Sequence, residues 1–145
     1  MKVLSNGTVY GLRALIYIAA HAKPGEFVSI REITEKLDIS FHFLTKVFQS
    51  LTQQNILTSY RGPNGGIALV NSPEEIYLID IVNVLEGEGF FGTCLLGLPG
   101  CGEFAPCPVH HFWSKVRGDM QKEFEGTTLA EMAKKIQDDR LRLTP

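Results

Sequence analysis

The chain has 145 residues, which fits one domain with an appendage, and its 44% hydrophobic and 21% charged content is typical of a globular protein with a core. No apolar run reaches the roughly 18–20 residues that cross a bilayer, which argues against a membrane-spanning protein. The net charge of −2 is divided unevenly, because residues 1–72 carry seven Lys or Arg against four acids, whereas residues 73–145 carry seven against twelve. The basic first half permits a surface that faces phosphates, without establishing one.

A first helix is expected over residues 5–22, ended by the turn of residues 23–26. Its apolar end, LIYIAAHA, has the small residues of a signal-peptide cleavage site, but Arg13 inside the apolar stretch favours a packed amphipathic helix. The expected buried face consists of Leu12, Ile16 and Ala19. Without an export signal we expect a cytoplasmic protein, whose three cysteines are reduced thiols, metal ligands or sensors rather than disulfide partners.

Two more helices follow, separated by a turn of about three residues. Ser29 and Glu32 form a capping box for the first, and Ser40 caps the second, which runs to about Gln54. The apolar side of the second helix carries Phe41, Leu44, Val47, Phe48 and Leu51. Its opposite side carries the hydrogen-bonding residues His42, Lys46, Gln49 and Gln53. The pattern is typical of a helix-turn-helix with a recognition helix, although a surface helix beside any core would look similar.

A β-hairpin is expected next, with strands over residues 56–60 and 67–70 and a glycine-rich tip over residues 61–66. Glycines let backbone approach a phosphate or a minor groove, and Arg61 adds positive charge. A purely structural hairpin would serve the fold equally, but the order helix, turn, helix, hairpin favours a wing. We therefore predict that double-stranded DNA contacts Ser40, His42, Phe43, Lys46, Gln49, Arg61 and Asn64. Phe43 lies at the edge of the recognition face, where it touches a thymine methyl or packs inward.

The second half is expected to hold three helices. The motif Ser72–Glu75, with proline at the first helical position, predicts a short helix that ends near Gly87. A longer helix begins near residue 109, and its apolar stripe consists of Val109, Phe112, Val116, Met120 and Phe124. We expect this stripe to contact both the first helix and a second copy of the chain. A last helix is capped by Thr128, and the charged tail from Asp138 is expected to fray.

The loop of residues 87–108 contains all three cysteines, Cys94, Cys101 and Cys107, in the pattern C-x6-C-x5-C, with His110 three residues later. Thiolates that converge on one point bind iron–sulfur clusters or zinc. Structural zinc sites usually contain a C-x2-4-C knuckle, which is absent here, so a cluster with His110 as its fourth ligand is favoured. A zinc site of three cysteines and one histidine, and a metal-free disulfide switch, remain open alternatives.

Enzyme function is not expected. The chain has no Ser-His-Asp pattern with local support, no P-loop and no dinucleotide-binding glycine motif. A small electron carrier is conceivable, but it would not need a winged hairpin.

Four segments resemble one family, the IscR/NsrR-type winged-helix regulators, or Rrf family. They are Tyr10–Leu15, the wing at residues 61–66, the cysteine loop with its following long helix, and Thr128–Glu131. The resemblance implies a homodimeric transcription regulator that binds a [2Fe–2S] or [4Fe–4S] cluster. Two subunits, each with one recognition helix, would read a pseudo-palindromic operator. It also implies a histidine ligand three residues after the last cysteine, which His110 matches. The carboxylate ligand that other members place in the first helix has no counterpart in residues 6–9.

Together these features predict a mainly α fold with a small β-hairpin wing. We expect a winged helix-turn-helix DNA-binding domain over residues 1–87, a cluster-binding loop over residues 88–108, and a dimerisation helix with a closing helix over residues 109–145. The predicted function is sensing of iron–sulfur, redox, nitric oxide or iron status. The alternative is a zinc-stabilised or cofactor-free winged-helix regulator.

Overall fold

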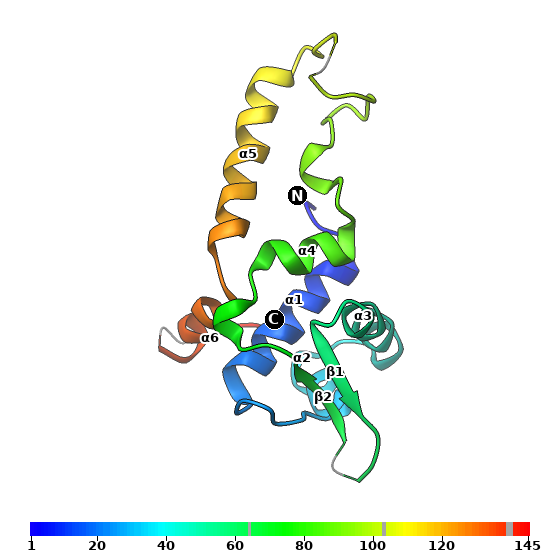
Figure 1. Cartoon of the computed structure of the whole chain (residues 1–145), viewed down its shortest axis with the longest axis vertical. Helices are drawn as coiled ribbons and strands as arrows, with labels where there is room; N and C mark the ends of the chain where they lie inside the picture. The colour runs from blue at the N-terminus through cyan, green and yellow to red at the C-terminus, as the bar shows by residue number, and fades with distance from the viewer. Residues whose placement is uncertain (64, 103, 139–140) are drawn as a thin grey trace.

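A computed structural model of the chain describes residues 1–63, 65–102, 104–138 and 141–145. The order of elements is α1 (Asn6–His21), α2 (Ile30–Leu37), α3 (Phe41–Gln53), β1 (Leu57–Tyr60), β2 (Gly66–Leu69), the 3-10 turn η1 (Pro73–Glu75), α4 (Leu78–Glu86), the 3-10 turn η2 (Phe90–Gly92), α5 (His110–Gly126) and α6 (Leu129–Asp138). The predicted fold class, mainly α with one antiparallel hairpin, is confirmed (Figure 1).

The helix α1 is the element around which most others pack, since it contacts α2, α3, α4 and α6. Its buried residues are Thr8, Gly11, Ala14, Leu15, Ile18 and Ala20. Leu12, Ile16 and Ala19, whose spacing predicted a packed helix, are half-buried and pack against the same core. Neighbours cover α1 on more than one side, and a single amphipathic stripe does not describe such a helix.

The two predicted serine caps begin α2 and α3. The Ser29 hydroxyl accepts a hydrogen bond from the Glu32 amide at 3.4 Å, and the Ser40 hydroxyl accepts one from the Phe43 amide at 3.4 Å. Between the two helices, Asp38 adopts the left-handed conformation with φ 54°, which makes the turn short. The helix-turn-helix thus follows from residues that the sequence pattern identifies.

The buried side of α3 consists of Leu44, Val47, Phe48 and Leu51, as predicted. Phe41 departs from the prediction, because it is 38% exposed. It is the first residue of α3, and the Arg31 guanidinium lies over its ring at 5.2 Å from the centroid.

The hairpin of β1 and β2 is fixed to the segment that precedes α2. Val28 and Ile67 exchange two backbone hydrogen bonds of 2.8 and 2.9 Å, which extends the ladder by one bridge. Gly66, paired with Tyr60, has φ 151°, and a Cβ atom there would overlap the Val28 carbonyl. Glycine is required at this position because two backbones approach closely.

The helix expected from Pro73 begins later than predicted. Residues 73–75 form a single 3-10 turn, and α4 starts at Leu78, after the Tyr77 amide donates to Asp80 Oδ2 at 3.1 Å. The intervening backbone is extended, because the Leu78 amide donates to the Thr127 carbonyl at 2.9 Å and the Ile76 carbonyl accepts from Leu129 at 2.9 Å. Pairing with the start of α6 therefore prevents helix formation here.

The long helix α5 lies at the outside of the molecule, and none of its residues is fully buried. Its main contacts are with α4 and η2 rather than with α1, the expected partner within the chain. The helix α6 packs along α1 instead. The ring of Phe124 meets the ring of Phe91 edge-on at 5.6 Å, which anchors the C-terminal part of α5 to η2.

The last residues return to the core. Arg13 donates through Nε to the Leu143 carbonyl at 2.7 Å and through Nη2 to the Leu37 carbonyl at 3.0 Å, and Leu143 packs against the core. The expectation of a frayed tail is therefore wrong for Leu143, because a half-buried arginine of α1 binds it.

The cysteine loop and the hairpin lie at opposite ends of the long axis of the molecule, with α4 between them (Figure 1). Across the described residues, no helix has both the length and the apolar character needed to span a bilayer.

Candidate functional site

The exposed face of α3 carries three of the predicted DNA-contacting residues. His42, Lys46 and Gln49 are exposed, and their spacing of four and three residues places them on one side of the helix. The Ser40 hydroxyl is engaged as the cap of α3. Phe43 is 38% exposed and its ring contacts the Tyr10 ring of α1 edge-on at 5.4 Å, so it packs toward the core side.

An open groove of about 940 Å³ runs between the start of α2, α3 and the hairpin. Gln49 and Arg61 both line it, so the structure brings these two predicted residues together. Arg31 and Thr45 line the same groove and were not predicted. The signal for Arg31 was its place in the first turn of α2, within the basic half of the chain. Asn64, also predicted to contact DNA, lies outside the described residues.

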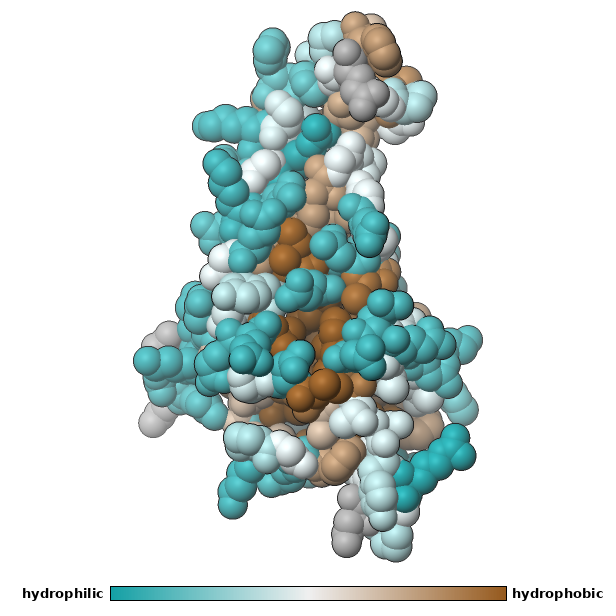
Figure 2. Space-filling view, viewed as in Figure 1, coloured by the Kyte–Doolittle hydropathy of each residue, from teal (hydrophilic) through white to brown (hydrophobic). Residues whose placement is uncertain are grey.

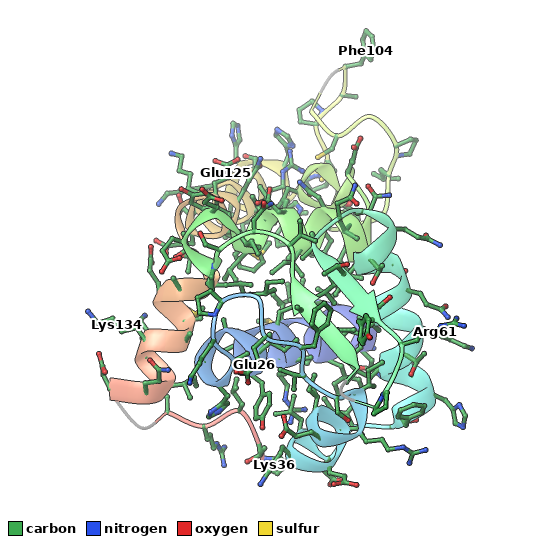
Figure 3. All side chains as sticks on the ribbon, turned by 60° about the horizontal axis from the view of Figure 1, so that its bottom comes forward. Glu26, Lys36, Arg61, Phe104, Glu125 and Lys134 are labelled. Atoms are coloured by element: carbon green, nitrogen blue, oxygen red, sulfur yellow. The ribbon has the colours of Figure 1, made fainter. Side chains whose placement is uncertain are left out.

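Figure 3 shows Arg61 where the hairpin passes α3, whereas Lys134 and Phe104 lie in other parts of the molecule (Figure 3). Phe104 marks the tip of the cysteine loop and is 96% exposed. The groove and the cysteine loop are therefore separate surfaces.

The four predicted metal-binding residues come together as two pairs. The Sγ atoms of Cys94 and Cys107 are 3.8 Å apart. The Sγ atom of Cys101 lies 3.5 Å from His110 Nδ1. Cys94 is buried, whereas Cys101 and Cys107 are half-buried. Thirteen residues separate the members of the first pair along the chain, and nine separate those of the second.

The environment of Cys94 favours its thiolate. The pKa of Cys94 lies below its ordinary value because the backbone N–H groups of Leu98 and Leu96 donate to the sulfur, and the thiols of Cys107 and Cys101 add to this effect. Burial acts in the opposite direction and is outweighed. Since the thiolate is the form that binds metals, the loop backbone prepares this sulfur for ligation.

One face of α5 holds the loop in place. His110 contacts Cys101, and Trp113, one turn later, donates through Nε1 to the Thr93 carbonyl at 2.8 Å. Gly102 lies directly against the imidazole, because a Cβ atom there would be 2.6 Å from His110 Cε1. Its φ of 82° is also one that glycine adopts without strain. The loop therefore closes over His110 only with glycine at this position.

Each of the two donor pairs has a separation compatible with two ligands of one tetrahedral metal ion. A tetrahedral metal ion binds sulfur at about 2.3 Å and nitrogen at about 2.0–2.1 Å. Two sulfur ligands of such an ion are therefore about 3.8 Å apart, and a sulfur and a nitrogen ligand are about 3.5 Å apart. The Cys94–Cys107 and Cys101–His110 pairs match these separations. Within the described residues, no three His, Cys, Asp or Glu side chains gather closely enough to hold one ion.

The element between the cysteine loop and the groove beside α3 is α4, which contacts α1, α3 and α5. Leu85 of α4 and Val47 of α3 meet over Gly11 of α1, where an added Cβ would lie 2.8 and 3.0 Å from their methyl groups. At the end of α4, Glu86 accepts a hydrogen bond from the Ser5 amide at 2.6 Å. The start of the cysteine loop is thereby tied to the start of α1.

Known proteins share both the sequence and the fold. The Rrf2 family, described as iron-dependent transcriptional regulators, matches residues 4–135. A relative from Aquifex aeolicus, named as an HTH-type transcriptional regulator, is 33% identical over 132 residues, covering 90% of each chain. The structure of T. potens IscR has a TM-score of 0.76 at 25% identity and covers 98% of this chain and 93% of its own. That of CymR, the global cysteine regulator of B. subtilis, has a TM-score of 0.74 at 27% identity, covering 92% and 98%.

These relatives are transcription regulators and not enzymes, in agreement with the absence of catalytic motifs from the sequence. The helix-turn-helix with its hairpin is the winged-helix arrangement predicted from the sequence. The chain belongs to the Rrf2 family of DNA-binding transcription regulators.

Proposed function

We propose that this regulator is a homodimer that senses through a [2Fe–2S] cluster held by Cys94, Cys101, Cys107 and His110. The observation that carries the proposal is the arrangement of these donors as two pairs, each with the separation of two ligands on one tetrahedral ion. A [4Fe–4S] cluster uses one protein ligand for each iron and would not need paired donors. A single zinc ion would need three or four donors around one point, which the described residues do not offer.

When bound, such a cluster supplies a redox-active centre that is lost or modified in response to the signal. The chain contributes three thiolates and one imidazole to this centre. Cys94 and Cys107 hold the two ends of the loop together, and Cys101 reaches the first turn of α5 through His110. Release of these contacts would free Cys101 and Cys107 from the start of α5, while Trp113 still holds the Thr93 carbonyl.

The proposed path from loop to DNA runs through α4. The loop begins directly after α4, and Phe91 at its start packs against Phe124 of α5. Since α4 also contacts α3, a shift of the loop changes the position of the recognition helix. The cluster shifts the equilibrium between the two conformations by the difference between their free energies of cluster binding, as any ligand does.

The proposed dimer uses α5. Phe112 and Val116 are 56% and 49% exposed on this helix. Figure 2 shows apolar side chains along the middle of the same face of the molecule, over α4 and beside α5 (Figure 2). Exposed apolar side chains of this kind favour a partner, and a second copy covers them symmetrically. Two recognition helices would then read half-sites about one turn of DNA apart, roughly 34–36 Å.

On DNA, we propose that α3 enters the major groove with His42, Lys46 and Gln49 toward the bases or phosphates. Arg31 and Arg61, on the two sides of the groove beside α3, would contact the phosphate backbone. The wing tip, which includes Asn64, would follow the adjacent backbone or minor groove.

The test is anaerobic purification, followed by analysis of iron, sulfide and zinc and by selection of bound fragments from genomic DNA. The proposal predicts a coloured protein with iron and sulfide whose affinity for the selected fragments differs from that of the metal-free protein. Cys101→Ala should lose the visible absorbance and remain folded. A colourless protein with one zinc per chain would establish the zinc-stabilised alternative. Iron and sulfide without any DNA affinity would contradict the regulatory role.

A further inference from the structure

Arg117 of α5 is a charged contact of the cysteine loop that the cysteine spacing does not reveal. Its Nη1 atom donates to Cys101 Sγ at 3.0 Å and to the Thr93 carbonyl at 3.2 Å. Arg117 follows His110 by seven residues, two turns of helix, so both side chains lie on the same face of α5. The sulfur of Cys101 therefore has two neighbours from α5, one imidazole and one guanidinium.

We infer that Arg117 is a positioning residue for Cys101 and that its positive charge sets the reduction potential of the metal centre. The inference rests on the proposed function, since it concerns the same donors. An arginine keeps its charge under all conditions in proteins, and a hydrogen bond from it to an anionic sulfur is charge-assisted. One-electron reduction adds a negative charge to the centre. A fixed positive charge in contact with a ligand sulfur stabilises the reduced form and raises the potential.

The same guanidinium also joins two parts of the loop. Thr93 precedes the first cysteine, and its carbonyl accepts hydrogen bonds from both Arg117 and Trp113. Arg117 thus connects the entry of the loop to Cys101, the middle cysteine. Such contacts to a ligand commonly contribute 10–100-fold to metal affinity. Loss of Arg117 should consequently weaken iron retention as well as lower the potential.

The test compares Arg117→Gln and Arg117→Lys with Lys122→Gln, a control that removes one charge from an exposed site on the same helix. Each full-length variant is reconstituted anaerobically with ferrous iron and sulfide and titrated with dithionite. Arg117→Gln should shift the oxidised-to-reduced equilibrium at least tenfold toward the oxidised form, which is 59 mV for a one-electron couple. It should also lose iron to a chelator about tenfold faster. Arg117→Lys should recover most of the potential, and Lys122→Gln should match the wild type.

Three results would overturn the inference, and they can be told apart. If wild-type protein binds iron and sulfide and Arg117→Gln keeps the wild-type potential, the metal centre stands and Arg117 has no role in it. If Arg117→Lys is as low in potential as Arg117→Gln, the positive charge is not the cause. If the wild type binds neither iron nor sulfide, the proposed function fails first and removes the basis of this inference.

Discussion

The substitution Gly11→Ala tests whether α1, α3 and α4 pack together at Gly11 as the structure shows. A methyl group added by Gly11→Ala would lie 2.8 Å from Leu85 Cδ1 and 3.0 Å from Val47 Cγ1. Both separations are shorter than a carbon–carbon contact of about 3.5–4.0 Å. Overpacking of this kind costs about 1–3 kcal/mol, and the better helix propensity of alanine returns up to about 1 kcal/mol. We therefore expect a net destabilisation of up to about 2 kcal/mol.

Gly7→Ala is the matched control, because Gly7 lies in the same helix and faces the same valine. Its added Cβ would be 3.7 Å from Val47 Cγ2, which is ordinary contact. Gly7→Ala should therefore leave stability unchanged or raise it by up to about 1 kcal/mol. Urea denaturation monitored by circular dichroism measures the free energy of unfolding of both variants. An unchanged m-value shows that the substitution changed stability and not the unfolded state.

A double-mutant cycle identifies the clash itself. Leu85→Ala removes the nearest methyl group, so the added methyl of Gly11→Ala should cost much less in that background. The coupling free energy should be about 1 kcal/mol or more. Additive effects, or a Gly11→Ala protein as stable as Gly7→Ala, would show that the three helices do not meet as described and would remove the proposed path from loop to recognition helix.

Three further predictions concern the DNA face, the dimer and pH. Arg61→Ala should weaken binding to all DNA sequences and reduce the salt dependence by about one unit of slope, while Lys134→Ala, on α6, should not; unchanged binding would remove the hairpin from the DNA interface. Val116→Asp should yield monomers in analytical ultracentrifugation and the neighbouring Lys115→Asp should not; a dimer in both would place the interface elsewhere. Burial raises the pKa of Glu86, but hydrogen bonds from Thr8 and Ser5 and the charge of Lys2 outweigh it, so its pKa lies below the ordinary value. The stability that Glu86 contributes is therefore present at neutral pH. It begins to be lost below the ordinary glutamate pKa of about 4.3 and is gone once the pH is below the lowered pKa of Glu86. Glu86→Gln should abolish that part of the acid dependence in unfolding measurements, and an identical pH profile would contradict it.

Local signals predicted the DNA-binding half well. The serines at positions 29 and 40 cap the helices that their patterns indicate, and the apolar spacing of α3 identifies its buried side except at Phe41. Helix caps and apolar periodicity depend on residues that are close in the sequence, so they can be predicted from the sequence alone.

Features that depend on distant partners were predicted poorly. The start of α4 is delayed because residues 76–78 pair with the start of α6, about fifty residues later in the chain. The spacing of Leu12, Ile16 and Ala19 identified only part of the packed surface of α1, because several helices surround it. Arg13 was predicted only as a residue unsuited to a signal peptide, whereas it binds the carbonyls of Leu37 and Leu143.

At the candidate metal site, the spacing of the cysteines identified the donors but not their pairing. Cys94 lies 3.8 Å from Cys107 and also interacts with the Cys101 thiol, while Cys101 contacts His110 and Arg117. Nothing in the sequence motif pointed to Arg117, since its role depends on how the loop folds back along α5.

The central claim is that Cys94 with Cys107 and Cys101 with His110 each hold one iron of a two-iron cluster. Mössbauer spectroscopy of protein reconstituted anaerobically with ⁵⁷Fe tests it directly, because the two irons would have different ligands. We predict two components of equal area, with two irons and two sulfides per chain, and loss of this pattern in His110→Ala. A single component with four irons per chain, or no iron bound after reconstitution, would contradict the claim.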